Sequence, residues 1–341
     1  MSDERRPVFL IAEAGVNHNG SLATALGLVD AAAAAGADAV KFQSFHARAL
    51  ATAAAPRAAY QRETTGSSAG QLAMLQALEL SPDDHRRIAA HCGERGIEFL
   101  SAPFDAESVE LLATLGLRRL KVPSGELLDV PFLRRVAALG LPLIVSTGMA
   151  TLSEVGAALA ALEAAGCPRA RVTVLHCTTE YPTPPGDVNL RAMVTMRDTF
   201  GVAVGYSDHT EGTVVAVAAA TLGASVIEKH LTLDRSQQGP DHRASLEPDA
   251  FAELVRGVRT VEAALGDGVK RPTAAELDNA AAARTSIVAA RTIAAGEPFT
   301  TGNLTTKRPG TGLSPLRWDD LLGRPASRPY EADDPIDEPL P

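Results

Sequence analysis

The chain has 341 residues, of which 45% are hydrophobic and 21% are charged, with a formal net charge of −9. This length accommodates one large domain with its own core and a small appendage, and the composition is that of a globular enzyme. The negative charge argues against a surface built for nucleic acid or for an anionic membrane.

The N-terminal segment, the apolar runs and the cysteines indicate where the protein is located. The charged first seven residues lead straight into a short apolar run, so no signal peptide is predicted. The alanine runs Ala31–Ala35 and Ala216–Ala220 are too short to span a bilayer. The three cysteines show no CxxC spacing, which indicates a reduced environment. We therefore expect a cytoplasmic protein without membrane segments.

Short apolar runs alternate along the chain with helical stretches rich in alanine and leucine. The apolar runs are Val8–Ala12, Ala39–Phe42, Ile97–Leu100, Arg119–Val122, Leu141–Val145, Val172–Leu175, Val202–Tyr206 and Ala224–Ile227. Helical patterns lie near residues 21–35, 82–95, 106–115, 130–139, 152–165, 189–199, 211–222 and 249–265. Strands joined by helices pair in parallel, and at this number they close most economically into a (β/α)8 barrel. An open doubly wound sheet is the alternative, disfavoured because no GxGxxG follows the first run.

A second region follows this alternating pattern. We assign residues 1–265 to the barrel, 266–283 to a linker marked by Gly, Asp, Lys and Pro, and 284–341 to a small β-rich module. No long helix is predicted in the module outside Trp318–Leu322. So small a module has little core of its own, so it should dock against the barrel or a partner chain.

Polar side chains stand at the end of every predicted strand. In chain order the groups are Glu13, Lys41 and Gln43, Ser101, Lys121 to Glu126, Ser146, His176, Ser207 to His209, and Glu228 to His230. The active sites of (β/α)8 barrels lie at this end of the strands. The period of two along a strand puts Lys41 and Gln43 on the inward face.

Two inward lysines require negative partners, because an unpaired buried charge is costly. With the hydroxyls of Ser124, Ser146 and Ser207, Lys41 and Lys121 would form a cradle for phosphate or carboxylate. The alternative is a purely structural network, in which the lysines pair with Glu13, Glu126 or Glu228.

Two histidines, His209 and His230, end neighbouring strands. Two imidazoles with open positions suit a divalent ion acting as a Lewis acid, although spacing alone does not choose the metal. His18, His176 and His242 are interpreted as structural or substrate-contacting. Asp241, in the loop after the last strand, either reaches a hydroxylated substrate or forms a solvated turn. Cys177 is interpreted as buried filler.

Together these motifs resemble the N-acetylneuraminate (sialic acid) synthase family over nearly the whole chain. The matching segments are Ile11–Gly20, Lys41–Gln43, Lys121–Glu126, Ser146–Met149, His176–Pro182, Gly205–Thr210, Glu228–His230 and Gly239–His242. Thr306–Gly312 is similar to the signature of the family's antifreeze-like (SAF) domain. The resemblance implies a metal-dependent barrel, with manganese the expected ion and magnesium or cobalt as alternatives. It also implies a domain-swapped homodimer in which each SAF domain covers the partner's active site.

By position in these motifs, the resemblance implies roles for individual residues. His209 and His230 would hold the metal, and Glu126 would lie beside the reacting carbon of phosphoenolpyruvate. The residues implied to hold phosphoenolpyruvate are Lys41, Lys121, Ser124, Ser146 and Ser207. Those implied to contact the N-acetylated sugar are Glu13, Gln43, Thr179, Tyr181 and Asp241, together with Arg308 from the other protomer.

Two positions depart from the family pattern. Ala102 stands where relatives often have threonine, so no hydroxyl is available to the phosphate there. Near Thr64–Gly66 relatives often carry an asparagine, which puts that contact in doubt.

The implied activity is condensation of phosphoenolpyruvate with open-chain N-acetylmannosamine and water, giving N-acetylneuraminate and phosphate. A legionaminic or pseudaminic acid synthase of the same family is the alternative. A pyruvate aldolase or lyase using a lysine Schiff base, and a non-catalytic sugar-binding protein, are more distant alternatives.

Overall fold

A computed structural model describes residues 7–57, 61–62 and 70–339. The segment Thr64–Gly66, one of the two departures from the family pattern, lies outside the described residues. The chain divides into two compact units, residues 1–266 and residues 267–341. Each unit is described by itself.

The first unit contains a sheet of eight parallel strands in the order β3-β2-β1-β8-β7-β6-β5-β4. The strands are β1 (Phe9–Gly15), β2 (Ala39–Ser44), β3 (Glu98–Pro103), β4 (Leu120–Val122), β5 (Leu143–Ser146), β6 (Val172–His176), β7 (Ala203–Asp208) and β8 (Val226–His230). The two ends of this order, β3 and β4, lie side by side, so the sheet curves into a nearly closed barrel. The predicted (β/α)8 fold is confirmed.

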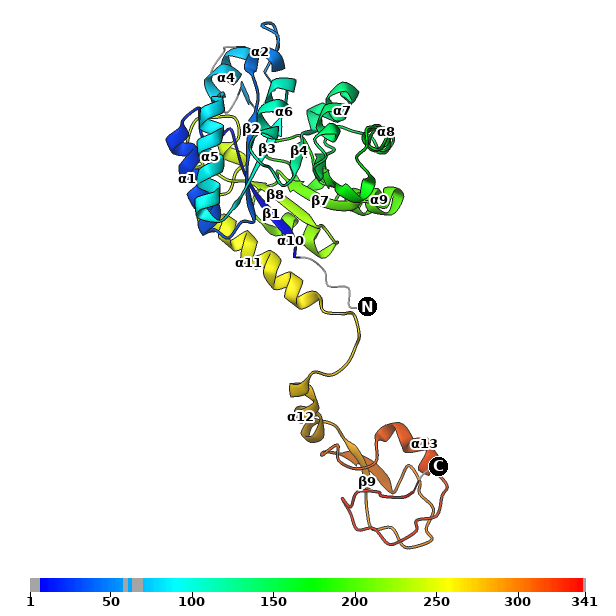
Figure 1. Cartoon of the computed structure of the whole chain (residues 1–341). Helices are drawn as coiled ribbons and strands as arrows, with labels where there is room; N and C mark the ends of the chain where they lie inside the picture. The colour runs from blue at the N-terminus through cyan, green and yellow to red at the C-terminus, as the bar shows by residue number, and fades with distance from the viewer. Residues whose placement is uncertain (1–6, 58–60, 63–69, 340–341) are drawn as a thin grey trace. The chain divides into compact units, whose positions relative to one another are not determined.

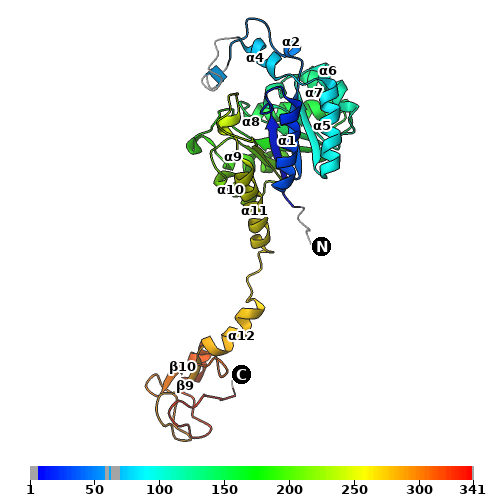
Figure 2. The ribbon, with the colours of Figure 1, turned by 90° about the vertical axis from the view of Figure 1, so that its left-hand side faces the viewer.

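Helices surround this barrel (Figure 1). They are α1 (Leu22–Ala34), α2 (Ala47–Leu50), α4 (Gln71–Leu78), α5 (Pro82–Arg95), α6 (Ala106–Ala113), α7 (Val130–Ala138), α8 (Leu152–Ala164), α9 (Arg191–Phe200), α10 (Val214–Thr221) and α11 (Pro248–Leu265). Helices α1 and α5 lie next to each other on the outer surface (Figure 2). The short helices α2 and α4, between β2 and α5, were not predicted. No helix among the described residues has the length and apolar character needed to cross a membrane.

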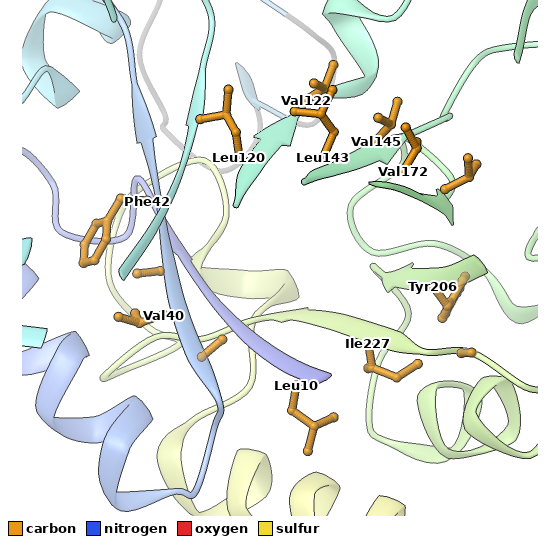
Figure 3. Close-up of a cluster of buried hydrophobic side chains, with 14 of the residues drawn as sticks. Leu10, Val40, Phe42, Leu120, Val122, Leu143, Val145, Val172, Tyr206 and Ile227 are labelled. Atoms are coloured by element: carbon orange, nitrogen blue, oxygen red, sulfur yellow. The ribbon is translucent and has the colours of Figure 1, made fainter. Parts of the chain in front are cut away.

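The apolar core has two layers, separated by the strands. Inside the barrel lie Ile11, Ala39, Leu100, Ile144, Leu175 and Val226. The larger layer lies between strands and helices, and Figure 3 shows strand side chains of this layer, including Leu10, Phe42, Val145, Tyr206 and Ile227. Fully burying each such side chain contributes about 1.5 to 3 kcal/mol. This alternation confirms the parity predicted for the second strand, because Ala39 lies in the barrel interior while Val40 and Phe42 face the helices.

Capping residues explain where several helices begin. Ser81 and Asp84 form a reciprocal capping box at the start of α5, and Pro82 occupies the first turn. Helix α5 then ends at Gly96, whose φ of 70° is left-handed. Thr151 and Glu154 form the same box at the start of α8. The cap of α8 lies in the segment that follows β5, whereas that of α5 lies in the segment that follows α4.

The second unit is the β-rich module predicted from the sequence. Strands β9 (Ser286–Ala289) and β10 (Leu304–Lys307) pair antiparallel, and α13 (Trp318–Leu321) follows. Its own buried cluster includes Ile287, Phe299, Leu321 and Tyr330.

The predicted linker, residues 266–283, is not wholly irregular. It contains helix α12 (Ala274–Ala283), which the sequence analysis did not predict. Thr273 and Glu276 form a capping box, and the helix is rich in alanine, the best helix former. None of its residues is buried, so local propensity rather than packing accounts for this helix.

Candidate active site

A cavity of about 160 Å³ lies inside the barrel at the carboxyl ends of the strands. It brings together most of the predicted site residues: Glu13, Lys41, Gln43, Lys121, Ser124, Ser146, Tyr181, Ser207, His209 and His230. Its wall is completed by Ala102, Phe104, Pro123, Gly125, Cys177 and Glu228. The lysines expected to hold an anion and the histidines expected to hold a metal therefore share one cavity.

A larger cavity, of about 280 Å³, lies at the opposite end of β3. It is lined by residues from α5 and from the segment before β4, with Glu98 and Arg118 as its charged side chains. This lining lacks a group of converging ionisable residues. The smaller cavity is the better candidate for catalysis, because chemistry depends on such groups and not on volume.

Two buried lysines and two buried glutamates form the floor of the smaller cavity. Lys41 Nζ lies 3.2 Å from Glu13 Oε2 and 3.2 Å from Glu228 Oε1. Lys121 Nζ lies 3.7 Å from Glu228 Oε1 and donates to Ser146 Oγ at 2.7 Å. Ser207 Oγ also donates to Glu228, at 2.9 Å. Of the three carboxylate partners considered in the sequence analysis, Glu13 and Glu228 pair with the lysines and Glu126 does not, and Glu228 is the residue that links the two lysines.

The pKa values of the two glutamates are shifted in opposite directions. It raises the pKa of Glu13 to about 7, because the opposing attraction of Lys41 is weaker than the cost of burying the charge. Burial would raise the pKa of Glu228 too, but Lys121 and Lys41 outweigh it and lower that pKa to about 2. The pKa of Lys41 is raised, because Glu13 and Glu228 outweigh its burial. Burial lowers the pKa of Lys121, although Glu228 acts in the opposite direction. Glu228 is therefore the firmly ionised carboxylate of the cluster near neutral pH, and it lies between the two lysines.

The two histidines lie close together on the β7 and β8 side of the cavity. The centres of the His209 and His230 rings are 5.4 Å apart, and the Tyr181 ring lies 4.1 Å from that of His209. His209 Nδ1 contacts the carbonyl oxygen of Thr178 at 2.6 Å, which makes this nitrogen the donor and leaves the Nε2 lone pair free to bind.

These histidines have the chemistry of metal ligands. Burial lowers the pKa of His209 to about 4 and, together with the charges of His209 and Lys41, lowers the pKa of His230 well below its ordinary value. Both rings are therefore neutral at pH 7, the form that binds metals. His230 Nδ1 is also buried with no hydrogen-bond partner among the described residues. In the same described ranges no cluster of three or more metal-binding side chains occurs, so water or substrate would complete the coordination of an ion held by this pair.

A tight corner lies beside Lys121. The Gly148 N–H donates to Ser124 Oγ at 3.0 Å and to Cys177 Sγ at 3.2 Å. A Cβ at Gly148 would lie 2.6 Å from Thr179 Cγ2 and 3.1 Å from Cys177 Sγ, so a larger residue there would have to displace its neighbours. Cys177 is buried as predicted, but it also forms part of the cavity wall.

Four predicted residues do not line the cavity. Glu126 is half-buried next to the lining residues Ser124 and Gly125, and burial together with Asp129 and Asp105 raises its pKa. Thr179 is exposed and contacts the Gly148 corner. Asp241 is buried, and burial raises its pKa to about 6 although Lys41 acts in the opposite direction. Arg308 belongs to the second unit.

The other histidines have structural contacts outside the cavity. His18 Nδ1 accepts from the Gly20 N–H at 3.0 Å, and His176 Nε2 contacts the Val188 carbonyl at 2.6 Å. His242 Nδ1 contacts Thr232 Oγ1 at 2.7 Å. Glu228 and Cys177, which the sequence analysis interpreted only as a structural ion-pair partner and as buried filler, also line the cavity, as does Phe104, to which it gave no role. Glu228 lies two residues before His230 on the same strand, so the two side chains point to the same face. This spacing was the sequence signal for Glu228.

The site thus places two lysines, a residue type that can bind an anion, and two neutral imidazoles, a group that can bind a metal, in the same cavity of a (β/α)8 barrel. Comparison with known families agrees with it. Residues 28–270 match the NeuB family and residues 284–339 match the SAF domain. The chain belongs to the NeuB family, and the expected family, fold and enzyme class are confirmed.

Several named relatives are similar along most or all of their length. The chain is 48% identical to the N,N'-diacetyllegionaminic acid synthase of Campylobacter jejuni, over 98% of this chain and 100% of that protein. It is 45% identical to the enzyme of the same name from Legionella pneumophila, over 92% of this chain and 89% of that one. Human N-acetylneuraminate-9-phosphate synthase is 36% identical over 98% of this chain and 93% of its own. The crystal structure of a sialic acid synthetase from Leptospira borgpetersenii has a TM-score of 0.70 and 32% identity, over 81% of this chain and 90% of that one.

Proposed function

We propose that this enzyme condenses phosphoenolpyruvate with an open-chain diacetamido sugar to form an N,N'-diacetyllegionaminic acid-type nonulosonate and phosphate. The observation that carries the reaction is the shared cavity of Lys41, Lys121, His209 and His230. The choice of sugar rests on identity: 48% to a legionaminic acid synthase against 36% to a neuraminate phosphate synthase. The sequence analysis favoured N-acetylmannosamine as acceptor, and the relatives favour its legionaminic alternative.

The anion would bind where positive charge and hydroxyl donors meet. Lys41 and Lys121 would hold the phosphate and carboxylate of phosphoenolpyruvate, and the hydroxyls of Ser124, Ser146 and Ser207 would fix their orientation. Ala102 supplies no hydroxyl, so these groups carry the anion without help from β3. Such preorganised donors also stabilise the charge of the departing phosphate.

His209 and His230 would hold a divalent ion, which we propose to be manganese. When bound, the ion would supply Lewis-acid polarisation of the aldehyde oxygen of the open-chain sugar. Tyr181 packs against the His209 ring and would exclude water on that side. The hydroxyl and acetamido groups of the sugar would be contacted by Glu13, Gln43, Thr179 and Asp241.

The bond changes follow from that placement. The methylene carbon of phosphoenolpyruvate attacks the aldehyde carbon, and positive charge develops at the adjacent enol carbon. Water adds there and phosphate leaves with cleavage of its C–O bond. Glu126 would take the proton from this water, a role that suits a half-buried carboxyl with a raised pKa. Holding both substrates in register is worth roughly 7 to 11 kcal/mol of the barrier.

We further propose a cytoplasmic homodimer in which Arg308 of each chain binds the N-acetyl group in the partner's site. This proposal rests on membership of the family and on the presence of the SAF module. The dimer would account for a site residue that lies in the second unit.

The test is an assay of phosphate release with phosphoenolpyruvate, Mn²⁺ and either a 2,4-diacetamido hexose or N-acetylmannosamine, with products identified by mass. We expect turnover mainly with the diacetamido sugar, and its loss in Lys121→Ala and His230→Ala. A preference for N-acetylmannosamine would overturn the choice of sugar. Phosphate release with neither sugar, or trapping of a pyruvate Schiff base by borohydride, would overturn the reaction.

A further inference from the structure

A fully buried ion pair lies behind the two histidines, on the outer face of the barrel. Asp208 on β7 and Lys229 on β8 are both 0% exposed, and Lys229 Nζ lies 2.8 Å from Asp208 Oδ2. The two residues are direct partners in the β7–β8 register. Each immediately precedes one of the histidines, His209 or His230. The pair is therefore one residue away from both proposed metal ligands.

Both members of the pair form hydrogen bonds with Thr210. Asp208 Oδ1 accepts from the Thr210 N–H at 2.9 Å and from the Thr210 hydroxyl at 2.8 Å. Lys229 Nζ also donates to the carbonyl oxygen of Thr210. The backbone on either side of His209 is thus tied to Asp208, and through Lys229 it is tied to the residue before His230.

Packing alone does not require charges at this place. The preceding residues on the same outer face, Tyr206 and Ile227, belong to the core between strands and helices, and the Tyr206 hydroxyl hydrogen-bonds to Asp208. Replacing a buried ion pair by apolar residues of similar volume is often neutral or stabilising. Apolar residues could fill the space of Asp208 and Lys229, but they could not hold the amide, hydroxyl and carbonyl of Thr210. What the ion pair adds, beyond filling space, is the fixed position of Thr210 relative to β7 and β8.

We infer that Asp208 and Lys229, through Thr210, are positioning residues that set the separation of the His209 and His230 rings. The inference rests on the proposed role of these histidines in holding the metal. Outer partners that orient metal ligands typically change metal affinity by about 10- to 100-fold when mutated. Lys41 and Lys121 lie on β2 and β4, so the pair does not hold the two lysines of the anion side, whereas Ser207 and Glu228 are its neighbours in sequence.

The experiment measures metal binding without turnover. The full-length protein is freed of metal and titrated with Mn²⁺, and free Mn²⁺ is followed by electron paramagnetic resonance. Variants are Lys229→Met, the double variant Asp208→Leu with Lys229→Met, Thr210→Val and Thr210→Ser. The apolar double variant matters because it leaves no unpaired buried charge and should fold even if the single variant does not. Thermal melts verify folding, and the melting shift with phosphoenolpyruvate alone reports the anion site.

We expect the double variant to bind Mn²⁺ about 10- to 100-fold more weakly than wild type while responding normally to phosphoenolpyruvate. Thr210→Val should weaken Mn²⁺ binding, whereas Thr210→Ser, which retains the hydroxyl, should not. Glu110→Gln, which removes an exposed partner of Arg135, is the control for loss of an ion pair. A folded double variant with wild-type Mn²⁺ affinity would overturn the inference and leave the proposed metal site intact. A wild-type protein that binds no Mn²⁺ would overturn both.

Discussion

Removing the charge of Glu228 tests whether this carboxylate neutralises the two buried lysines of the cavity. Its Oε1 meets Ser207, Lys41 and Lys121 at 2.9, 3.2 and 3.7 Å. Glu228→Gln would remove the carboxylate that both buried lysines share and would leave Glu13, which lies 3.2 Å from Lys41 Nζ, as the remaining carboxylate partner. Breaking a buried ion pair costs about 3 to 5 kcal/mol. The glutamine oxygen can still accept from Ser207, so we expect about 3 kcal/mol.

This loss converts into a measurable change in melting temperature. At about 2 °C per kcal/mol for a domain of this size, the unliganded variant should melt about 6 °C lower than wild type. Phosphoenolpyruvate supplies the missing negative charge, so it should raise the melting temperature of Glu228→Gln more than that of wild type. Glu110→Gln, at an exposed pair 3.1 Å long, should cost less than about 1 kcal/mol. The reasoning is refuted if Glu228→Gln is as stable as this control, or if phosphoenolpyruvate stabilises variant and wild type equally.

Three other predictions follow from the same geometry. The pKa of Glu13 is raised from 4.5 to about 7, so folding takes up a proton at this carboxyl. Relative to Glu13→Gln, the wild type should therefore lose stability as the pH rises from 4.5 to about 7. Parallel profiles of unfolding free energy against pH, measured in urea, would contradict this. His209→Asn and His230→Asn should each abolish Mn²⁺ binding in a calorimetric titration, yet retain the melting shift caused by phosphoenolpyruvate. Gly148→Ala should lower stability by about 1 to 3 kcal/mol, because the new Cβ clashes with neighbouring side chains. Gly186→Ala, which has open space around its Cβ, should not lower stability. Equal melting curves for the two variants would refute the clash.

Local patterns predicted most of the barrel. Each apolar run became a strand with its ends shifted by a few residues, because inward and outward faces are both buried and must both be apolar. Helix α12 was not predicted, although Thr273 and Glu276 carry its capping box. The glycines and proline beside it dominated the interpretation of that segment as a linker.

The sequence by itself determined which side chains point into the barrel and at which end they gather, because parity and strand polarity are local properties. It therefore placed Lys41, Lys121, His209 and His230 at one rim. Only the tertiary structure decided how these charges pair, since the partners come from strands far apart in sequence: Glu228 between two lysines, and Lys229 against Asp208. Ion pairing depends on distance in space and on burial, and both arise only when the sheet closes.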